Sequence, residues 1–553
     1  WMFLSSFETL RQTYLNNDIV NMCHLGARAF EEIGGEVVQT ATWVSRNCHT
    51  PNCNGTFVRL VPFDSQDEKE KKFLTHTAKN YYVSNSRFNS IPGKALAYWL
   101  GNPDVFTQGI LLEKVANPRQ GMKTLDNDYY IRLWHEVSRN NIMVSATDAQ
   151  VAIKSGCKWF PINHGGEYRK YYGNNYTVVN WYNDGEEMKA NAIKKYNCIT
   201  RTITNIAYYF KPGVTWSVIC SKPSFRWYGT GFLFSNGGQC VVPDEDDELE
   251  YIAGFLNSKV TEYLLNILSP TLGFESGYLK KLPIIKGVDK KTEILSLTER
   301  NISICKTDWD SYETSWDFKR NPLAPSAQAL REQMDSQFVS SRMEKFGCIN
   351  WHFENWKQEC EDRFQQLKKN EEELNRIFID IYGLQDELTP DVADKDVTVH
   401  RIFDSKDDVP ESMKGSNYVR TMRDEIVSLI SYAVGCMFGR YSLDKPGLVF
   451  AGYSKIEQTT KTLDGDDPEL EKFAKQNSDG SVSYGSYYHE VNQDNYKSFP
   501  IDTDNIIPIC DDEYFDDDIT GRFVKWVETV YGKETLEENL KFIADAEYLL
   551  RGV

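Results

Sequence analysis

The spacing of apolar side chains predicts a short α/β segment at the start of the chain. Residues 18–26 form an apolar run that ends at Gly26, and residues 35–44 and 56–61 alternate between apolar and polar positions, as strands do. Before them, residues 2–16 carry apolar side chains near one face of a helix: Phe3, Leu4, Phe7, Leu10 and Leu15. Helix, strand and an antiparallel pair in this order predict the closing third of an α/β domain whose opening is missing.

The middle of the chain changes to charged and then β-like patterns. Residues 63–83 contain the charged run DSQDEKEKK and predict a connector. Short β-like runs separated by turn residues fill 84–240. Residues 251–268 predict one strong amphipathic helix. We therefore expect a mostly β domain over 84–287.

The last part of the chain has a helical pattern followed by an acidic, mixed one. In the segment 363–384, Gly383 fits a helix C-cap, and one helical face is apolar: Phe364, Leu367, Leu374, Ile377 and Ile381. The chain after residue 396 is acidic, and a final helix is predicted near 536–550. These patterns predict a helical spacer over 288–395 and an acidic C-terminal domain over 396–553.

One segment, residues 158–181, has an unusual mixture of side chains. Its sequence KWFPINHGGEYRKYYGNNYTVVNW contains seven aromatic residues, interleaved with Lys158, Arg169 and Lys170. Gly165, Gly166 and Gly173 supply turns between them. Flat rings, cations and tight turns together are typical of a surface that reads DNA. They are equally typical of a twisted β domain with half-buried aromatic side chains, and both interpretations stay open at this point.

Length and composition exclude several classes of protein. At 553 residues the chain is too long for a single core, and its hydrophobic fraction of 41% is that of a folded soluble protein. No apolar run reaches the roughly 18 to 20 residues that a membrane helix needs, and the sequence does not start with a cationic region followed by an apolar one, so a cytoplasmic protein is expected. Among the 12 cysteines the closest pair is Cys48 and Cys53, and without a second such pair we expect no metal site.

The charge is distributed unevenly along the chain. The net charge is −18, but residues 84–240 contain 18 Lys and Arg against 10 Asp and Glu, a balance of +8. The rest of the chain therefore carries −26. A basic segment inside an acidic protein favours a nucleic-acid surface at that segment.

Several stretches, taken in order, resemble a known family. They are HLGARAFEEIGGEVVQTATWV (24–44), DNDYYIRLWHEV (126–137), the segment 158–181, GFLNSKVTEYLLNILSPTLGFESGYLKKLPI (254–284), DWDSYETSWDF (308–318) and SYAVGCMFGRYSLDKPGLVFAG (431–452). The stretches resemble consecutive landmarks of the PglX family, the adenine-specific DNA methyltransferases of the BREX phage-exclusion systems. The resemblance covers nearly the whole chain.

This resemblance implies an α+β multidomain fold. Residues 1–62 would be the end of a Rossmann-like methyltransferase sheet, 63–83 the charged connector and 84–287 a mostly β DNA target-recognition domain. The helical spacer and the mixed C-terminal domain would follow. The implied partner is double-stranded DNA. Other BREX proteins, or a phage inhibitor that mimics DNA, are further partners to consider, and no membrane is expected.

The chain lacks the motifs that perform the chemistry in such enzymes. The resemblance implies S-adenosylmethionine as the cofactor of the complete enzyme, held by a Gly-rich strand–loop, and an Asn-Pro-Pro-Tyr loop that holds the adenine. Neither loop is present: no Asn-Pro pair is followed by a second Pro, and Gly229-Thr230-Gly231 is an isolated G-x-G that favours a β-turn. We therefore expect no catalytic residue here, and this chain alone to be inactive.

The resemblance and the basic segment together indicate candidate site residues. Phe30 occupies the place where related adenine methyltransferases offer a ring to the flipped base, although it equally fits a core anchor under the sheet. The candidate DNA-binding residues are Lys123, Arg132, Lys158, Arg169, Lys170, Tyr171, Asn174, Asn175, Arg201, Lys211 and Arg226. Two other functions stay open: a free-standing DNA-specificity module, and an interaction scaffold without catalysis.

Overall fold

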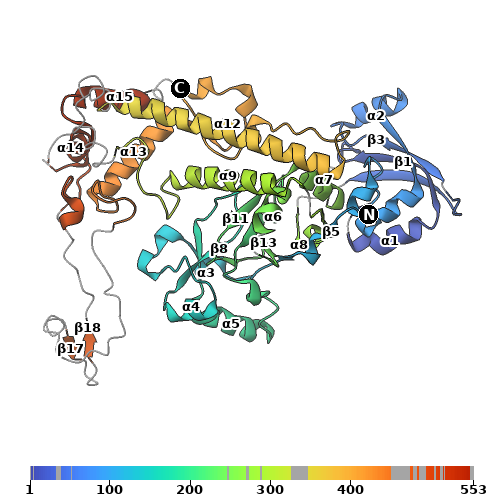
Figure 1. The fold of residues 1–553 in the computed structure, drawn as a ribbon, viewed down its shortest axis with the longest axis horizontal. Helices are drawn as coiled ribbons and strands as arrows, with labels where there is room; N and C mark the ends of the chain where they lie inside the picture. The colour runs from blue at the N-terminus through green and yellow to red at the C-terminus, as the bar shows by residue number, and fades with distance from the viewer. Residues whose placement is uncertain are drawn as a thin grey trace.

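The computed structural model is elongated, and one long helix ties its parts together. It describes residues 2–548 except 4, 33–38, 52, 246–247, 270–272, 287–288, 326–346, 450–473, 477–481, 485–492, 503–505, 511–514 and 516. The long helix, α12 (Ile349–Tyr382), has 34 residues and is about 50 Å long at 1.5 Å per residue. It runs along the top of Figure 1, from the C-terminal helices at one end to the N-terminal sheet at the other.

The N-terminal part is a four-stranded mixed sheet with the strand order β2-β1-β3-β4. Its elements are α1 (Glu8–Tyr14), β1 (Asp18–Gly26), β2 (Thr40–Arg46), β3 (Asn54–Arg59), α2 (Gln66–Leu74) and β4 (Lys79–Ser84). The expected antiparallel pairing of 35–44 with 56–61 is wrong, because β1 lies between these two strands, antiparallel to β2 and parallel to β3. The apolar run of β1, with Ile19 and Met22 buried, needs neighbours on both sides. Residues 35–38 lie outside the described part.

The predicted connector 63–83 is part of this sheet domain. Its charged run forms α2, and its end forms β4, which pairs antiparallel with β3. Lys69 is buried, and its Nζ donates hydrogen bonds to the carbonyl oxygens of Leu60 (2.9 Å) and Phe63. Most charged residues of this run therefore lie on the outer face of a short helix, and the run is not a linker. The first helix is also shorter than predicted, and Phe7 and Leu10 on it are exposed.

The region 84–287 contains two four-stranded sheets and several helices. The first sheet has the order β11-β10-β13-β6, from β6 (Ala116–Arg119), β10 (Gly213–Ser217), β11 (Phe225–Tyr228) and β13 (Gly238–Pro243). The second has the order β12-β8-β9-β7, from β7 (Ile131–Leu133), β8 (Trp159–Asn163), β9 (Thr177–Asn180) and β12 (Leu233–Phe234). The helices are α3 (Asn127–Tyr130), α4 (Ala149–Lys154), α5 (Tyr182–Tyr196), α6 (Leu249–Leu256), α7 (Lys259–Leu268) and α8 (Ser276–Leu279). The region is therefore a mixture of helices and strands, and Gly229-Thr230-Gly231 connects β11 to β12.

The single helix predicted over 251–268 is two helices, α6 and α7. Asn257 interrupts them because its side chain is used elsewhere: Nδ2 donates to the carbonyl oxygen of Phe225 (2.9 Å), and Oδ1 accepts from the Phe225 amide (3.1 Å). Ser258 then caps α7 by accepting from the amide of Thr261 (3.4 Å). A side-chain clamp on β11 thus overrides the continuous apolar periodicity.

The remaining elements are mostly helical. They are α9 (Lys291–Asp310), α12, β15 (Arg401–Phe403), β16 (Val419–Thr421), α13 (Met422–Met437), the short pair β17 (Ala474–Gln476) and β18 (Val482–Tyr484), α14 (Ile519–Tyr531) and α15 (Leu536–Tyr548). The predicted apolar face of α12 is confirmed, since Phe364, Leu367, Leu374 and Ile377 are buried. The C-cap is confirmed too, with Gly383 at φ +63°.

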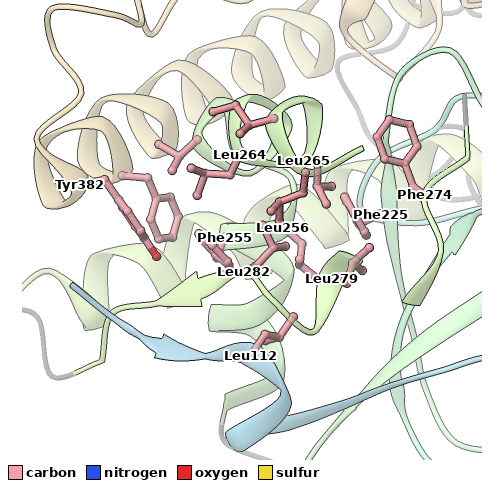
Figure 2. Packing of buried hydrophobic residues seen from close by; sticks show 14 of the residues in the cluster. Leu112, Phe225, Phe255, Leu256, Leu264, Leu265, Phe274, Leu279, Leu282 and Tyr382 are labelled. Carbon is pink, nitrogen blue, oxygen red and sulfur yellow. The ribbon is translucent and has the colours of Figure 1, made fainter. Parts of the chain in front are cut away.

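One hydrophobic core joins the first three predicted domains. It includes Phe57 of β3, Trp216 of β10, Ile294 of α9 and Leu374 of α12. Figure 2 shows its centre, where Phe255 and Leu256 of α6 and Leu264 of α7 lie in one cluster with Tyr382 at the end of α12, and the rings of Phe255 and Tyr382 are stacked. The expected boundary near 287 therefore does not separate two cores. Of the helices in the described part of the chain, none is both long and apolar enough to cross a bilayer.

Candidate nucleic-acid interface

The aromatic segment 158–181 forms two antiparallel strands, β8 and β9, and a long loop between them. The loop depends on its glycines. A Cβ at Gly166 (φ +128°) would lie 2.6 Å from Nδ2 of Asn174, and a Cβ at Gly173 (φ +122°) would lie 2.4 Å from Cδ of Arg169. The tight turns thus let the loop fold closely on its own side chains.

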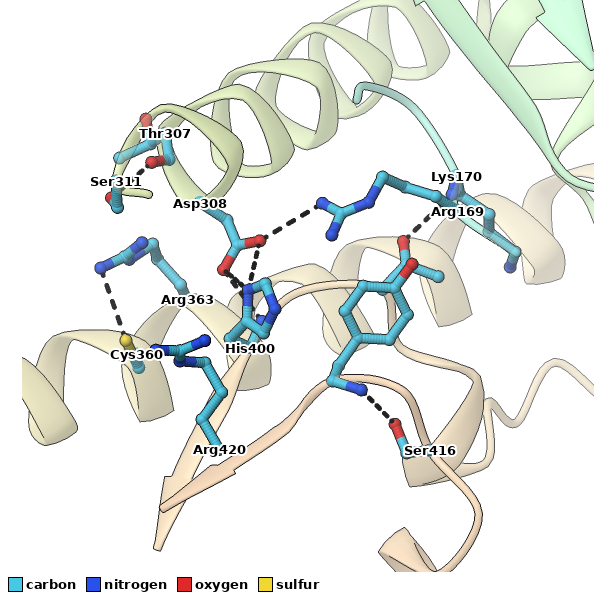
Figure 3. Close-up of polar contacts among 12 residues, drawn as sticks. Arg169, Lys170, Thr307, Asp308, Ser311, Cys360, Arg363, His400, Ser416 and Arg420 are labelled. Carbon is cyan, nitrogen blue, oxygen red and sulfur yellow. Dashed lines mark hydrogen bonds and ion pairs between the residues drawn. The ribbon is translucent and has the colours of Figure 1, made fainter. Parts of the chain in front are cut away.

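The centre of this loop inserts between the helices of the spacer and does not face solvent. Arg169 lies 3.4 Å from the Asp308 carboxylate on α9, and Nδ1 of His400 lies 3.0 Å from both oxygens of the same carboxylate (Figure 3). Burial alone would raise the pKa of Asp308, but His400 and Arg169 together hold it well below its usual value. Asp308 is therefore a buried anion shared by the loop and the C-terminal region.

The neighbouring cation forms a second buried ion pair. Nζ of Lys170 lies 2.8 Å from Oε2 of Glu371 on α12, with exposed fractions of 8% for Lys170 and 2% for Glu371. Burial favours the neutral amine, but the Glu371 carboxylate outweighs it and raises the pKa of Lys170. Lys170 thus connects the β-rich region to the long helix.

Three more predicted DNA contacts are buried. Tyr171 and Asn175 have exposed fractions of 1% and 6%. Arg226 on β11 is 2% exposed, and burial lowers its pKa to about 10. Together with Arg169 and Lys170, which pair with acids of the helical spacer, these residues are buried and not accessible to DNA in this structure. These five are therefore not among the DNA contacts that we propose.

Three other predicted cations are exposed and lie on one surface. Lys123 and Arg201 are brought together because the amide of Lys123 donates to the carbonyl oxygen of Thr202 (2.7 Å). A second contact joins the same two chain segments closer to Lys211, where Nδ2 of Asn205 donates to the carbonyl oxygen of Gln120 (2.9 Å). Residues 119–125 and 201–211, which carry these three exposed cations, therefore lie side by side.

Two tyrosine rings hold further cations on this surface. The guanidinium of Arg201 and the ammonium of Lys195 lie 5.3 and 5.6 Å from the ring centre of Tyr196. The guanidinium of Arg119 and the ammonium of Lys211 lie 5.0 and 5.6 Å from that of Tyr208. We call this surface the basic ridge, defined by Arg119, Lys123, Lys195, Arg201 and Lys211. Arg119 and Lys195 were not among the predicted contacts, although each lies in the basic segment.

A cavity of about 460 Å³ opens beside the basic ridge. Its lining includes Lys123, so the cavity and the ridge share a residue. The other lining residues are Met122, Thr124, Leu125, Asn127, His164, Ser235, Asn236 and Gly237. No acidic side chain is among them. Sequence reasoning missed this site, because 122–127, 164 and 235–237 are far apart in the chain.

The last three predicted DNA-binding residues lie apart from the ridge. Arg132 is half-buried on β7, and its guanidinium donates to the carbonyl oxygen of Ile131 (2.8 Å). Lys158 lines a second cavity, of about 620 Å³, whose lining also includes Glu186 and Glu187. Nδ2 of Asn174 donates to the carbonyl oxygen of Glu167 (3.0 Å). The structure does not bring these residues to the ridge.

Phe30 lies after β1, with 47% of its surface exposed. An exposed ring does not fit the core-anchor interpretation, in which the side chain would be buried under the sheet. The ring is available to a ligand, and its contact with a flipped base stays a prediction.

The N-terminal sheet does not fit an S-adenosylmethionine site. Its strand–loop–helix unit, β3 to α2, has no glycine in the intervening residues 60–65. The first turn of α2 carries Asp67 and Glu68, which would repel the carboxylate of the cofactor. Within the described residues, no three His, Cys, Asp or Glu side chains are grouped to hold a metal ion.

Fold and surface define a protein of mixed helices and strands with a basic ridge on its β-rich region. In sequence, nearly all of it is related to adenine-specific methyltransferases: it is 38% identical over 557 residues to PglX of Lacticaseibacillus casei (strain Zhang), and 34% identical over 555 residues to BrxX of Escherichia coli O9:H4 (strain HS). Each alignment covers 99% of this chain and 40% of the relative, so the chain spans two fifths of their length. The resemblance to PglX is confirmed. No family model matches the chain.

Two solved structures show weaker similarity. The type IIL restriction-modification enzyme MmeI in complex with DNA matches with a TM-score of 0.38 and 10% identity, covering 70% of this chain and 46% of that one. The type IIG restriction endonuclease BpuSI matches with a TM-score of 0.24 and 9% identity, covering 53% and 40%. Scores this low carry no argument about the arrangement of the domains.

Proposed function

We propose that this chain supplies DNA target recognition to a site-specific adenine-N6 DNA methyltransferase of a phage-defence system. Two relatives named adenine-specific methyltransferases, each matching 99% of the chain, support this function over a free-standing specificity module or a scaffold. The observation that carries the proposal is the basic ridge, in which four exposed cations and the half-buried Arg119 lie on a protein with a net charge of −18.

The ridge fits a phosphate backbone. Its cations lie against tyrosine rings or on loops that are hydrogen-bonded to each other. Their positions are therefore restricted before DNA binds. Lys and Arg contacts to phosphates give affinity and register, and they release counterions. In this proposal the ridge orients the duplex, and neighbouring polar side chains read the bases.

The chemistry belongs to the rest of such an enzyme. S-adenosylmethionine supplies the methyl group and would bind outside this chain, because the N-terminal sheet does not fit it. This chain alone is expected to be inactive. Phe30 is proposed to stack on the extruded adenine, which would replace part of the stacking lost on flipping. Other BREX proteins or a DNA-mimicking inhibitor are further proposed partners, the latter at the ridge.

The test measures binding of the 553-residue chain to a fluorescent duplex at several salt concentrations. We expect affinity to fall steeply with salt, with a slope of about −0.9 per neutralised phosphate. The variant Lys123→Ala/Arg201→Ala/Lys211→Ala should lower both the affinity and the slope. A matched variant, Lys406→Ala/Lys414→Ala, removes two exposed lysines outside the ridge and should bind as the wild type does. Equal binding by both variants would overturn the proposal.

A further inference from the structure

The cavity beside the basic ridge contains a histidine whose hydrogen-bonding role is fixed by its neighbours. Nδ1 of His164 lies 3.0 Å from Oγ of Ser235. The same Oγ accepts hydrogen bonds from the amides of Gly237 (3.2 Å) and Gly238 (3.1 Å). With two donors already pointing at this oxygen, the hydroxyl hydrogen of Ser235 is directed to Nδ1 of His164.

This arrangement selects one tautomer of His164. If Nδ1 accepts from Ser235, the proton of the neutral ring is on Nε2, which is then a hydrogen-bond donor. Burial lowers the pKa of His164, which keeps the ring neutral at physiological pH. His164 is one of the lining residues of the cavity, and its neutral ring carries an uncharged N–H donor at Nε2.

Two other lining side chains are donors as well. The hydroxyl of Thr124 donates to Oδ1 of Asn127, which orients the Asn127 amide so that its NH₂ group is the end left to bind a ligand. Lys123 contributes an exposed ammonium. The nearest acid on the same turn, Asp126, accepts from the amide of Tyr129 (3.0 Å) as a helix cap. The cavity is therefore rich in donors beside a surface of cations.

We propose that this cavity binds a hydrogen-bond acceptor group of DNA, with His164 as a directed donor to that group. The inference rests on the proposed function, because it needs DNA on the ridge. Two groups of DNA have the required chemistry: a backbone phosphate oxygen, and the N7 and O6 edge of guanine. His164 and Lys123 would contact it together, one as a directed neutral donor and the other as a charge.

The experiment selects bound DNA from a pool of duplexes with a randomised core, using the 553-residue chain, and measures affinity for individual duplexes at two salt concentrations. His164→Phe removes the donor and keeps a ring, and we expect it to weaken binding of the preferred duplex roughly tenfold. His164→Gln retains an N–H donor and should recover part of the affinity. Thermal melting of each variant separates a binding defect from a folding defect.

The two sources of the acceptor give different results. If it is guanine, His164→Phe loses the preference for guanine at one position, and 7-deazaguanine at that position weakens the wild type but not the variant. If it is phosphate, the variant weakens all duplexes alike, with an unchanged salt slope because no charge is lost. The inference is overturned if His164→Phe folds normally and keeps both affinity and sequence preference while the ridge variant loses affinity. If the ridge variant also binds normally, the proposed function itself fails.

Discussion

The cations of the basic segment fall into two groups with opposite roles. Arg169, Lys170 and Arg226 are buried, the first two against the helical spacer, whereas Lys123, Arg201 and Lys211 are exposed on the ridge. Each group contains both lysine and arginine, so residue type does not separate them. They differ in their tertiary contacts, because acids from outside the basic segment form ion pairs with two of the buried residues.

This difference changes the meaning of the segment's charge of +8. Asp308 and Glu371 neutralise Arg169 and Lys170, and Asp396 lies 2.8 Å from Nζ of Lys222. Part of the excess charge therefore holds the β-rich region to the acidic remainder of the chain. The charge available to DNA is that of the ridge, a smaller and more localised group than the sequence count indicates.

The largest expected effect comes from breaking the buried pair on α12. Lys170→Met should lower the free energy of unfolding by about 3–5 kcal/mol, because Glu371 is left without its partner in a dry environment. Lys123→Met on the ridge is the matched control and should change it by less than about 0.5 kcal/mol. Urea unfolding measures both. The double variant Lys170→Met/Glu371→Leu should recover most of the lost free energy of unfolding. A Lys170→Met variant as stable as the control would show that the comparison is mistaken.

The carboxylate of Asp308, which Arg169 and His400 share, should make the stability of the protein sensitive to acid. Its pKa in the folded state is below the unfolded value of about 3.9, so its stabilising effect is complete above about pH 4 and is lost as pH falls further. Asp308→Asn should cost about 2–3 kcal/mol at pH 7. The difference in the free energy of unfolding between variant and wild type should become smaller below pH 4. Urea unfolding from pH 7 to 3.5 measures it. The exposed Asp404→Asn is the control, and a gap that widened in acid would contradict the assignment.

The exposed ring of Phe30 is expected to affect activity more than stability. In a full-length enzyme that contains this chain, Phe30→Ala should slow methyl transfer about ten- to hundredfold, because a ring stacked on a base is worth roughly 1–3 kcal/mol. The melting temperature should change little, since the ring is 47% exposed. Phe30→Leu should have a smaller effect on methyl transfer. If Phe30→Ala instead melted early and Phe30→Leu restored both properties, the residue would be a structural anchor.

The smallest effect should come from a single ridge residue. Arg201→Ala should weaken DNA binding about tenfold, and Arg201→Lys distinguishes the kind of contact. If Arg201 binds phosphate, Lys restores affinity for all sequences. If it binds guanine with two hydrogen bonds, Lys restores less of the affinity and relaxes one position of the preferred sequence. Fluorescence anisotropy with preferred and random duplexes measures both, and unchanged binding by Arg201→Ala would remove it from the ridge.

The sequence determined the local elements and the relatedness of this protein. The apolar face of α12 and its cap at Gly383 were predictable, because helical periodicity and a left-handed C-cap are local properties. The ordered landmarks indicated the family, since they depend only on residue identity. The division of 251–268 was not predictable, because the side chain of Asn257 is held by Phe225 on a distant strand.

Tertiary structure alone decided which cations are available to a ligand. Asp308 lies 139 positions beyond Arg169, and His400 lies 92 positions beyond Asp308, so the three residues form one cluster only when α9 and the C-terminal region fold over the loop. The cavity at His164 also combines three separate segments of chain. Burial and ion pairing depend on contacts between distant residues, and no local pattern of charge or aromaticity contains that information.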